Sequence, residues 1–397
     1  MEAEHTHNHS EPPNHLSDLR FRRDQEHIRT WDNWYCPIAT EDLRHLMRSV
    51  SGNTEALDLI RCGQRIFAVG FLNAPREYYD GENGPNQHHF HSRLGTALTA
   101  DFKRFVTLNT QALVAESDES SIWSGSFARG PRTANGEPQY FFFYTCRAPL
   151  SPFGLSQSIR VAVTVDFVQF SRLSETLTAD ARWYEENTMR GDTAIHAFRD
   201  PYPIQVEGQD YLLISAKSKF LPAGKIGEIA GANGIIAVYR INFEEGRFNV
   251  SPTSLCFAGG KPEMEVASMY FDTQTHEYVL CYSAHHDTDY LQRIADQRGL
   301  PVGTIHESGV FYEARIANLP DLLQNPPTRP VWLDPKEVPG MARNSYANRW
   351  IPELGGRSLG FDEGTGEPSG DGPVRPSYQS ILSEFRGNSG AESRLFT

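Results

Sequence analysis

The chain has 397 residues, which is ample for a sizeable hydrophobic core in one large domain or two ordinary ones. Its 50 acidic and 37 basic residues give a net charge of −13, which argues against binding nucleic acid or anionic membranes through a basic surface. Aromatic residues make up 11% of the chain and there are 32 glycines and 25 prolines, a composition that favours short strands and many turns over long helices.

Residues 1–20 are polar and carry four histidines, and we expect them to form a disordered tail rather than a metal site. They lack the apolar segment of a secretory signal, and no stretch of about 18 apolar residues follows that could span a membrane. Localisation therefore stays open between the cytoplasm and secretion by a route that leaves no signal here. The five cysteines are scattered without a CxxC pair, so we expect neither a disulfide framework nor a zinc site.

The remaining chain predicts two helices and many strands. Residues 40–50 predict a helix capped by Thr40, and residues 173–187 predict a second one. Because a sandwich with so many strands would be unusually large, we expect a β-propeller, which leaves only short sheet edges exposed. Seven short β-branched and aromatic runs predict strands: 65–72, 140–148, 158–170, 210–218, 234–243, 277–285 and 309–316.

The end of the chain changes composition. Residues 361–377 are rich in Gly, Pro and acids and predict a loop or linker, and the tail up to Thr397 is expected to be weakly ordered. We therefore divide the chain into an N-terminal tail (1–20), a β-propeller domain (21–360) and a loop-rich C-terminal segment (361–397).

Three acidic motifs carry the candidate chemistry. The stretch "TWDNWYCPI" contains Asp32, "FRDP" contains Asp200, and "KPEMEVASMYFD" contains Glu263 and Glu265. Residues two apart in a strand face the same side, so the two glutamates should point together and one should be easier to protonate. Glycoside hydrolysis uses such a set, in which one carboxylate attacks or activates water and one carboxylic acid protonates the leaving oxygen.

Each motif also has an ordinary structural interpretation. Asp32 could cap a turn, Arg199 and Asp200 could form a structural ion pair, and the paired glutamates could lie on a solvated strand face. The ordered set of three favours glycoside hydrolysis over these separate interpretations. Aromatic side chains near such carboxylates stack on sugar rings, and the candidates are Trp31, Trp34 and Trp123.

The motifs, in this order, resemble those of glycoside hydrolase family 68. This family comprises levansucrases, inulosucrases and bacterial β-fructofuranosidases, and it shares a clan with the family 32 invertases. The resemblance spans about residues 30–350. It rests on "WDNW" followed by Pro37, "IWSGS" (122–126), "FRDPYPIQVEGQDYLLISA", "EMEVASMYF" and "SYANRW" (345–350).

The resemblance implies an all-β fold, namely a five-bladed β-propeller with a central funnel-shaped active site. It also implies a retaining enzyme that acts on sucrose or fructans through a fructosyl-enzyme, without a cofactor. Asp32 would be the nucleophile, Glu265 the general acid/base and Asp200 the stabiliser of the transition state, with the Asp32 and Glu265 carboxyls about 5–5.5 Å apart. The resemblance assigns the donor pocket to Trp31, Trp123, Ser124, Arg199, Glu263 and Tyr346.

The chain departs from the family pattern at several positions. Val266 stands where the family has an Arg after the acid/base Glu, and residues 282–290 lack another Arg, for which His285 or His286 is the candidate replacement. Calcium-binding members have an Asp just before the Glu pair; Lys261 and Pro262 stand in this region, so we expect no calcium. The histidines of "NQHHFHS" (86–92) are expected in a surface loop rather than a metal site.

Two alternatives remain open from the sequence. An arabinanase-like enzyme acting on another furanoside also uses three separated carboxylates, although many such enzymes invert configuration. A non-catalytic carbohydrate-binding propeller would bind sugars without turnover. The sequence leaves hydrolysis and transfer, the donor and acceptor sugars, the linkage and the oligomeric state undetermined.

Overall fold

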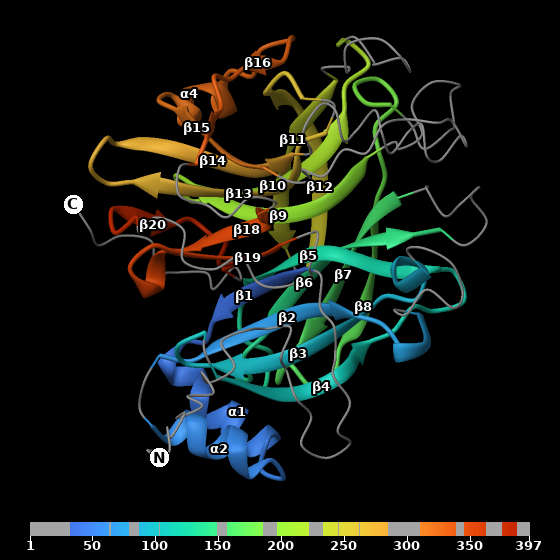
Figure 1. Cartoon of the computed structure of the whole chain (residues 1–397), viewed down its shortest axis with the longest axis vertical. Coiled ribbons are helices and arrows are strands. Elements are labelled where there is room, and N and C mark those ends of the chain that lie inside the picture. Colours follow the sequence, from blue (N-terminus) through green and yellow to red (C-terminus); the bar gives the residue numbers. More distant parts are fainter. Residues whose placement is uncertain are drawn as a thin grey trace, which may run out of the picture.

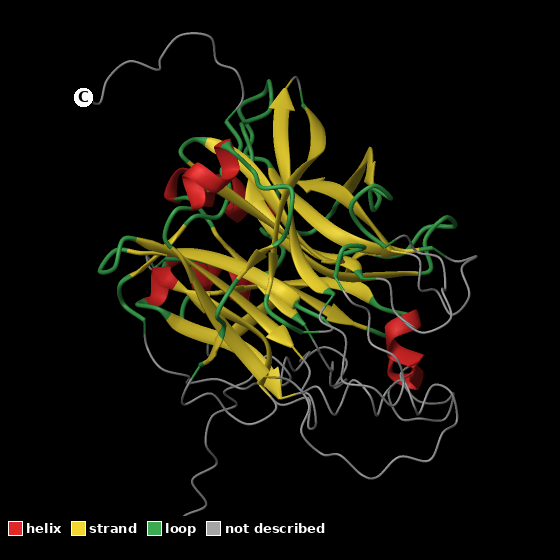
Figure 2. Cartoon of the chain, turned by 90° about the horizontal axis from the view of Figure 1, so that it is seen from above, coloured by secondary structure: helices red, strands yellow, loops and turns green. Residues whose placement is uncertain are grey.

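The computed structural model is dominated by strands, with short helices at the periphery (Figures 1 and 2). Among the described residues, no helix is long and apolar enough to cross a bilayer. The structure describes residues 32–62, 65–78, 87–102, 104–148, 157–185, 197–221, 233–244, 246–261, 263–284, 310–338, 345–362 and 375–386.

The first two blades are four-stranded antiparallel sheets in which the strands follow chain order. Blade one contains β1 (Asn33–Pro37), β2 (Phe67–Asn73), β3 (Arg93–Thr99) and β4 (Phe105–Leu113). Blade two contains β5 (Ser121–Arg129), β6 (Tyr140–Arg147), β7 (Gln157–Thr164) and β8 (Ser171–Leu177).

The third and fourth blades are five-stranded because later segments join them. Blade three contains β9 (Phe198–Val206), β10 (Gln209–Lys217), β11 (Gly234–Glu244), β12 (Arg247–Ala258) and β16 (Val331–Trp332). Blade four contains β20 (Tyr378–Ser380), β13 (Glu265–Asp272), β14 (Glu277–Ala284), β15 (Val310–Ile316) and β17 (Lys336–Glu337).

All seven predicted strands are confirmed, and β6 shows why the aromatic runs predict them. Every residue of "YFFFYTCR" is buried, because both faces of the strand pack against neighbouring blades. Phe142 stacks on Trp34 of blade one at 5.1 Å between ring centroids. Phe141 and Phe143 face the opposite way and contact Phe248 of blade three. Aromatic contacts therefore join blade two to blade one on one face and to blade three on the other.

The helix predictions are only partly confirmed. Residues 40–49 are helical, but Thr40 is not a side-chain cap. The helix predicted over 173–187 is wrong, because residues 171–177 form the outer strand β8. The helix α2 was not predicted; the side chain of Asn53 caps it by accepting a hydrogen bond from the Ala56 amide at 3.0 Å. The helical segments are η2 (Thr40–Asp42), α1 (Leu43–Ser49), α2 (Thr54–Arg61), η3 (Arg76–Tyr78), η4 (Gln87–Phe90), α4 (Leu319–Gln324) and η6 (Pro352–Leu354).

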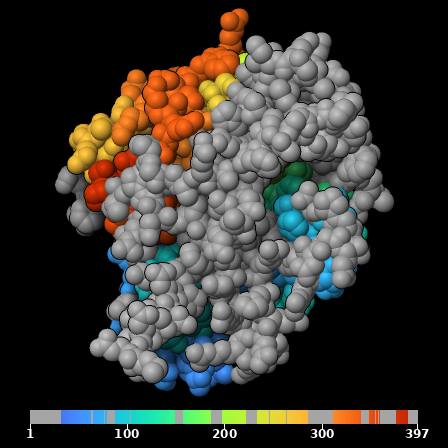
Figure 3. Space-filling model, in the orientation of Figure 1, coloured from blue at the N-terminus to red at the C-terminus, as the bar shows by residue number. Residues whose placement is uncertain are grey.

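A two-stranded sheet, β18 (Ser345–Ile351) with β19 (Arg357–Asp362), lies between blades four and one. β18 packs against β13, and the Tyr35 hydroxyl of β1 donates to the Trp350 carbonyl of β18 at 2.9 Å. The chain is therefore an all-β propeller with four blades among the described residues. In the space-filling view, blade four and α4 lie at the opposite end of the molecule from α1 and α2 (Figure 3).

Residues 375–386 form what we call the C-terminal strap. β20 pairs with β13, Gln205 of β9 donates its amide to the Ile381 carbonyl at 2.7 Å, and Phe385 donates its amide to the Arg129 carbonyl of β5 at 2.8 Å. The strap thus links the inner strands of three blades. This differs from the expected boundary at residue 360, because part of the C-terminal segment belongs to the propeller sheet system.

Candidate active site

The predicted catalytic carboxylates come from the starts of three inner strands. Asp32 directly precedes β1, Asp200 is the third residue of β9, and Glu265 is the first residue of β13. Ser124 lies in the same part of β5. All three carboxylates are buried, with 3–6% of each residue exposed. Burying a carboxylate is energetically costly unless it is paired, so a group of buried carboxylates usually has ion-pair partners or a function.

Irregular backbone directs these side chains toward one another. On β9, Asp200 and Pro201 together face the single residue Ile214, and Asp200 has a φ of +57°. The β13–β14 pairing shifts after Glu265, where Val266 has a φ of +50°. A β-branched residue with positive φ is strained, and such bulges commonly re-aim side chains beside active sites.

Two hydrogen bonds hold these bulges from adjacent blades. The Asp200 amide donates to Thr145 Oγ1 of β6 at 2.9 Å. The Val266 amide donates to Asp200 Oδ2 at 3.0 Å. The position of the Asp200 carboxylate is therefore fixed through blade two on one side and blade four on the other.

Arg199 joins the second and third acidic motifs. Its Nη2 donates to Glu263 Oε2 at 3.0 Å and to Glu265 Oε1, and its Nε lies 3.6 Å from Asp200 Oδ2. The fully buried Lys217 lies 3.4 Å from Glu263 Oε1. Arg199 and Asp200 do form the ion pair of the structural interpretation, and the same guanidinium also contacts Glu263 and Glu265.

Asp32 has a different environment. Its Oδ1 accepts the Asn33 amide at 2.8 Å, while Oδ2 is buried and has no hydrogen-bond partner among the described residues. Burial raises the pKa of Asp32 to about 6, against the opposing effects of the Arg349 charge and the Ser124 hydroxyl. Burial also raises the pKa of Asp200, which Arg199 opposes and Glu265 reinforces.

The raised pKa of Asp32 predicts a pH-dependent cost to stability. The folded state binds more protons than the unfolded state between pH 3.8 and about 6, so the free energy of unfolding falls as pH rises through this window. We expect Asp32→Asn to stabilise the fold by on the order of 2–3 kcal/mol at neutral pH and by nothing at the acid end of the window. Urea unfolding of both proteins across this range measures the difference.

The matched control is Asp58→Asn in α2, where 73% of the side chain is exposed. This exposed position should change the free energy of unfolding by less than about 0.5 kcal/mol. A stability gain for Asp32→Asn that does not change with pH would contradict the assignment of a raised pKa to Asp32.

Trp123 lies in β5 and is held from two sides. Its Nε1 donates to the His89 carbonyl at 2.9 Å, and the Arg147 guanidinium lies 4.4 Å from its ring centroid. The histidine motif therefore contributes a 3-10 turn, η4, that supports this tryptophan. By contrast, Trp34 is 1% exposed and stacks in the core, so the idea that it contacts a sugar is wrong.

Other predicted residues lie partly or wholly outside the described structure. Trp31, His285 and His286 are not among the described residues. Tyr346 belongs to β18, where its backbone pairs with Phe361, but its side chain is not described. No group of three or more His, Cys, Asp or Glu residues in the described part of the chain could hold a metal ion.

Four residues of this candidate site were not predicted from the sequence. Lys217, Thr145 and Arg147 follow no motif that marks them, because their importance comes from contacts between blades. Arg349 lies within the quoted "SYANRW" stretch, but only its burial and its position beside Asn33 distinguish it. Its Nε donates to the Asn33 carbonyl at 3.1 Å.

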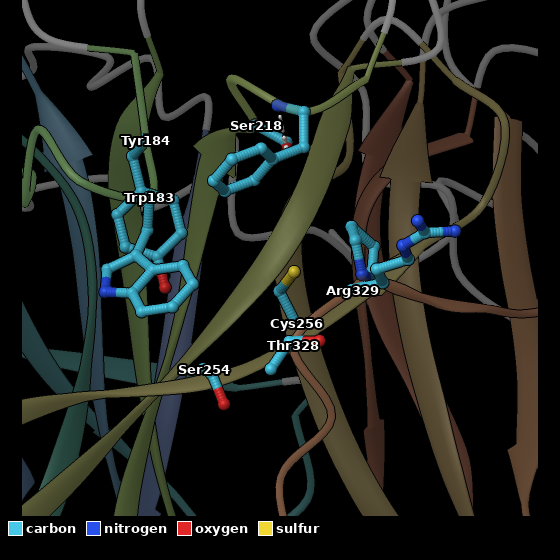
Figure 4. A pocket seen from close by; sticks show the side chains of 9 residues that line it. Trp183, Tyr184, Ser218, Ser254, Cys256, Thr328 and Arg329 are labelled. Carbon is cyan, nitrogen blue, oxygen red and sulfur yellow. Dashed lines mark hydrogen bonds between the residues drawn. The ribbon is translucent and has the colours of Figure 1, made fainter.

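A small pocket lies elsewhere, between blade three and the segment before β16 (Figure 4). Trp183, Phe220 and Arg329 are among its lining residues, and none of the four site carboxylates lines it. Phe220 is 58% exposed and its ring packs edge-on against Trp183. This pocket is separate from the carboxylate cluster.

No protein-family model matches the chain, and no curated protein matches it. Several solved structures are similar to this chain. A levansucrase from B. megaterium has 12% identity and a TM-score of 0.51, with 89% of this chain and 83% of that chain covered. A β-fructofuranosidase from Schwanniomyces occidentalis has 13% identity and a TM-score of 0.47, with 75% and 49% covered, so this chain spans about half of its length.

An endo-arabinase from Bacteroides thetaiotaomicron has 12% identity and a TM-score of 0.47, with 81% of this chain and 91% of that chain covered. At these identities, structural similarity concerns the fold alone. The levansucrase match confirms, at the level of the fold, the resemblance predicted from the ordered motifs: the chain has the β-propeller fold of the levansucrase structure.

Proposed function

We propose that the protein is a retaining β-fructofuranosidase or fructosyltransferase that acts on sucrose or related fructosides. The observation that carries this proposal is the convergence of the buried Asp200, Glu263 and Glu265 on Arg199, with Asp32 electrostatically coupled to Asp200. A stability requirement does not explain such a cluster, since buried ionic groups generally contribute little net stability. In this proposal, the β18–β19 sheet is the fifth blade and the inner strands surround a central funnel.

The first step is displacement of the leaving group. Asp32 Oδ2 attacks the anomeric carbon of the fructosyl unit, the bond from that carbon to the leaving oxygen breaks, and Glu265 gives its proton to that oxygen. Asp32 Oδ2 accepts no hydrogen bond of ordinary geometry from the described residues, which suits a nucleophile, and the nearby Ser124 hydroxyl favours the ionised form of the carboxyl. Above a pH of about 6, Asp32 is ionised and able to attack.

The second step releases the fructosyl group. The Glu265 carboxylate takes a proton from water or from a sugar hydroxyl, the oxygen attacks the anomeric carbon, and the bond to Asp32 breaks. Two inversions give net retention. Glu263 contacts two cations, Arg199 and Lys217, so we assign the transferable proton to Glu265. Asp200, fixed by Val266 and Arg199, serves as the stationary charge that binds fructosyl hydroxyls.

The test is incubation with sucrose, with separate measurement of glucose and fructose and NMR assignment of the first product anomer. Glucose release with a β-configured fructosyl product is the expected result. A deficit of fructose relative to glucose indicates transfer to sugars, and equal amounts indicate hydrolysis. Cleavage of arabinan with inversion and no glucose from sucrose would favour the arabinanase alternative, and sugar binding without turnover would favour the non-catalytic one.

A further inference from the structure

One buried cation near the carboxylates is not accounted for by the mechanism above. Arg349 of β18 is 2% exposed. Its Nε donates to the Asn33 carbonyl of β1 at 3.1 Å, and its Nη2 donates to the Gly125 carbonyl of β5 at 3.4 Å. The guanidinium carbon lies 5.7 Å from the ring centroid of Tyr202 in β9. One side chain therefore reaches the inner strands of three blades.

Each of these contacts lies beside a site residue. Asn33 follows Asp32 and Gly125 follows Ser124. The β18 backbone directs the arginine there through a register shift between Tyr346 and Arg349, where Ala347 has a φ of +52° and donates its amide to Ser283 Oγ at 2.9 Å. This irregularity resembles those at Asp200 and Val266, which supports a role for β18 in the same site.

The charges near the site are unevenly distributed. Arg199 contacts Asp200, Glu263 and Glu265, and Lys217 contacts Glu263. No ion pair of 4.0 Å or less joins Asp32 to any described residue. The Nη1 of Arg349 is buried and has no hydrogen-bond partner in the described part of the chain. Arg349 is therefore a cation beside Asn33, the neighbour of the proposed nucleophile, and no carboxylate among the described residues forms a direct ion pair with it.

We propose that Arg349 is the positioning residue of the nucleophile: it ties β18 to β1 and β5 and supplies the positive charge that balances Asp32. This inference deepens the proposed function, on which the role of Asp32 as nucleophile rests. The titratable groups that respond to Arg349 are Asp32, Asp200 on β9, Tyr202 on β9 and Tyr270 on β13. Burial raises the pKa of both phenols, so neither tyrosine changes charge around neutral pH.

The test is a double-mutant cycle on stability that requires no activity. Unfolding at several pH values measures how much Asp32→Asn raises the free energy of unfolding. This gain is determined once in the wild-type background and once in the Arg349→Met background. Removing the cation should move the upper edge of the pH window, which lies at about 6 in the wild type, upward by about one unit. Arg349→Lys, which keeps the charge, should return the window to its wild-type position.

Two further variants keep the test decisive. Arg349→Gln removes the charge but keeps an N–H donor, and it replaces Arg349→Met if that variant does not fold. Arg160→Met removes an arginine that pairs with Asp118 and Glu119 in blade two, and it should lower stability without moving the window. The proposal is wrong if the upper edge of the pH window stays at the wild-type pH in the uncharged Arg349 variants that fold. It is also wrong if Arg160→Met moves that edge by the same amount.

Activity provides a second, separable measurement. If fructosides are turned over, the acid limb of the kcat/KM profile should move upward with the same window in Arg349→Met and return in Arg349→Lys. If the protein turns over no fructoside, the stability cycle still reports whether Arg349 and Asp32 are coupled. Failure of the proposed function and failure of this inference are therefore distinguishable.

Discussion

Asp32→Asn should reduce kcat/KM for sucrose by about 10⁴-fold or more, without unfolding the protein. The amide is nearly isosteric with the carboxylate but cannot form the fructosyl-enzyme, and loss of a catalytic nucleophile or its direct partners has effects of this size. The Asn33 amide donates to Asp32 Oδ1 at 2.8 Å, and an asparagine oxygen can accept the same hydrogen bond, so the substitution removes chemistry rather than a structural contact. Initial rates of glucose release measure the loss.

A chemical rescue separates a nucleophile from a residue that only shapes the pocket. In Asp32→Ala, added azide can occupy the vacated space and attack the anomeric carbon, forming a carbon–nitrogen bond as the glucosyl oxygen leaves with the Glu265 proton. The expected product is a fructosyl azide of inverted configuration. Asp58→Asn, an exposed carboxylate in α2, should retain wild-type activity. Full activity of Asp32→Asn would contradict the mechanism.

The motifs of the site were predictable because each is local in sequence. Asp32, Asp200 and Glu265 each lie within one short stretch of the sequence, and the order of the three motifs carries more information than any one of them. The supporting residues were not predictable in this way. Thr145 matters because its hydroxyl meets the Asp200 amide from another blade, and Lys217 because it reaches Glu263 from β10. Such contacts depend on how the blades pack against one another, and a local sequence pattern does not predict that packing.

The errors in the fold prediction have a similar cause. Residues 171–177 contain Ser, Glu and Thr at helix-compatible spacing, yet they form the outermost strand of blade two, where polar side chains are tolerated at a sheet edge. The short helix α2 was missed, although its Asn53 cap was readable. Most of the C-terminal strap was expected to be weakly ordered, because the strands with which it pairs lie more than 100 residues away and no local pattern indicates them.

The C-terminal strap contains one deeply buried aromatic side chain. Phe385 is 2% exposed and its ring lies within 6 Å of Phe141, Phe143, Phe243 and Phe248. These partners come from blades two and three, so Phe385 fills the space between two blades. Edge-to-face packing of such rings adds to the free energy of burial.

Phe385→Ala should therefore lower the free energy of unfolding by about 3–5 kcal/mol, because it leaves a cavity bounded by strands that cannot collapse together. Phe220→Ala is the matched control, since that ring is 58% exposed and its removal should change stability by less than about 1 kcal/mol. Urea unfolding of both variants gives the comparison. Equal, small effects would mean that the strap is dispensable. A large effect confined to Phe385 would establish that the last described residues of the chain hold the blades together around the carboxylate cluster.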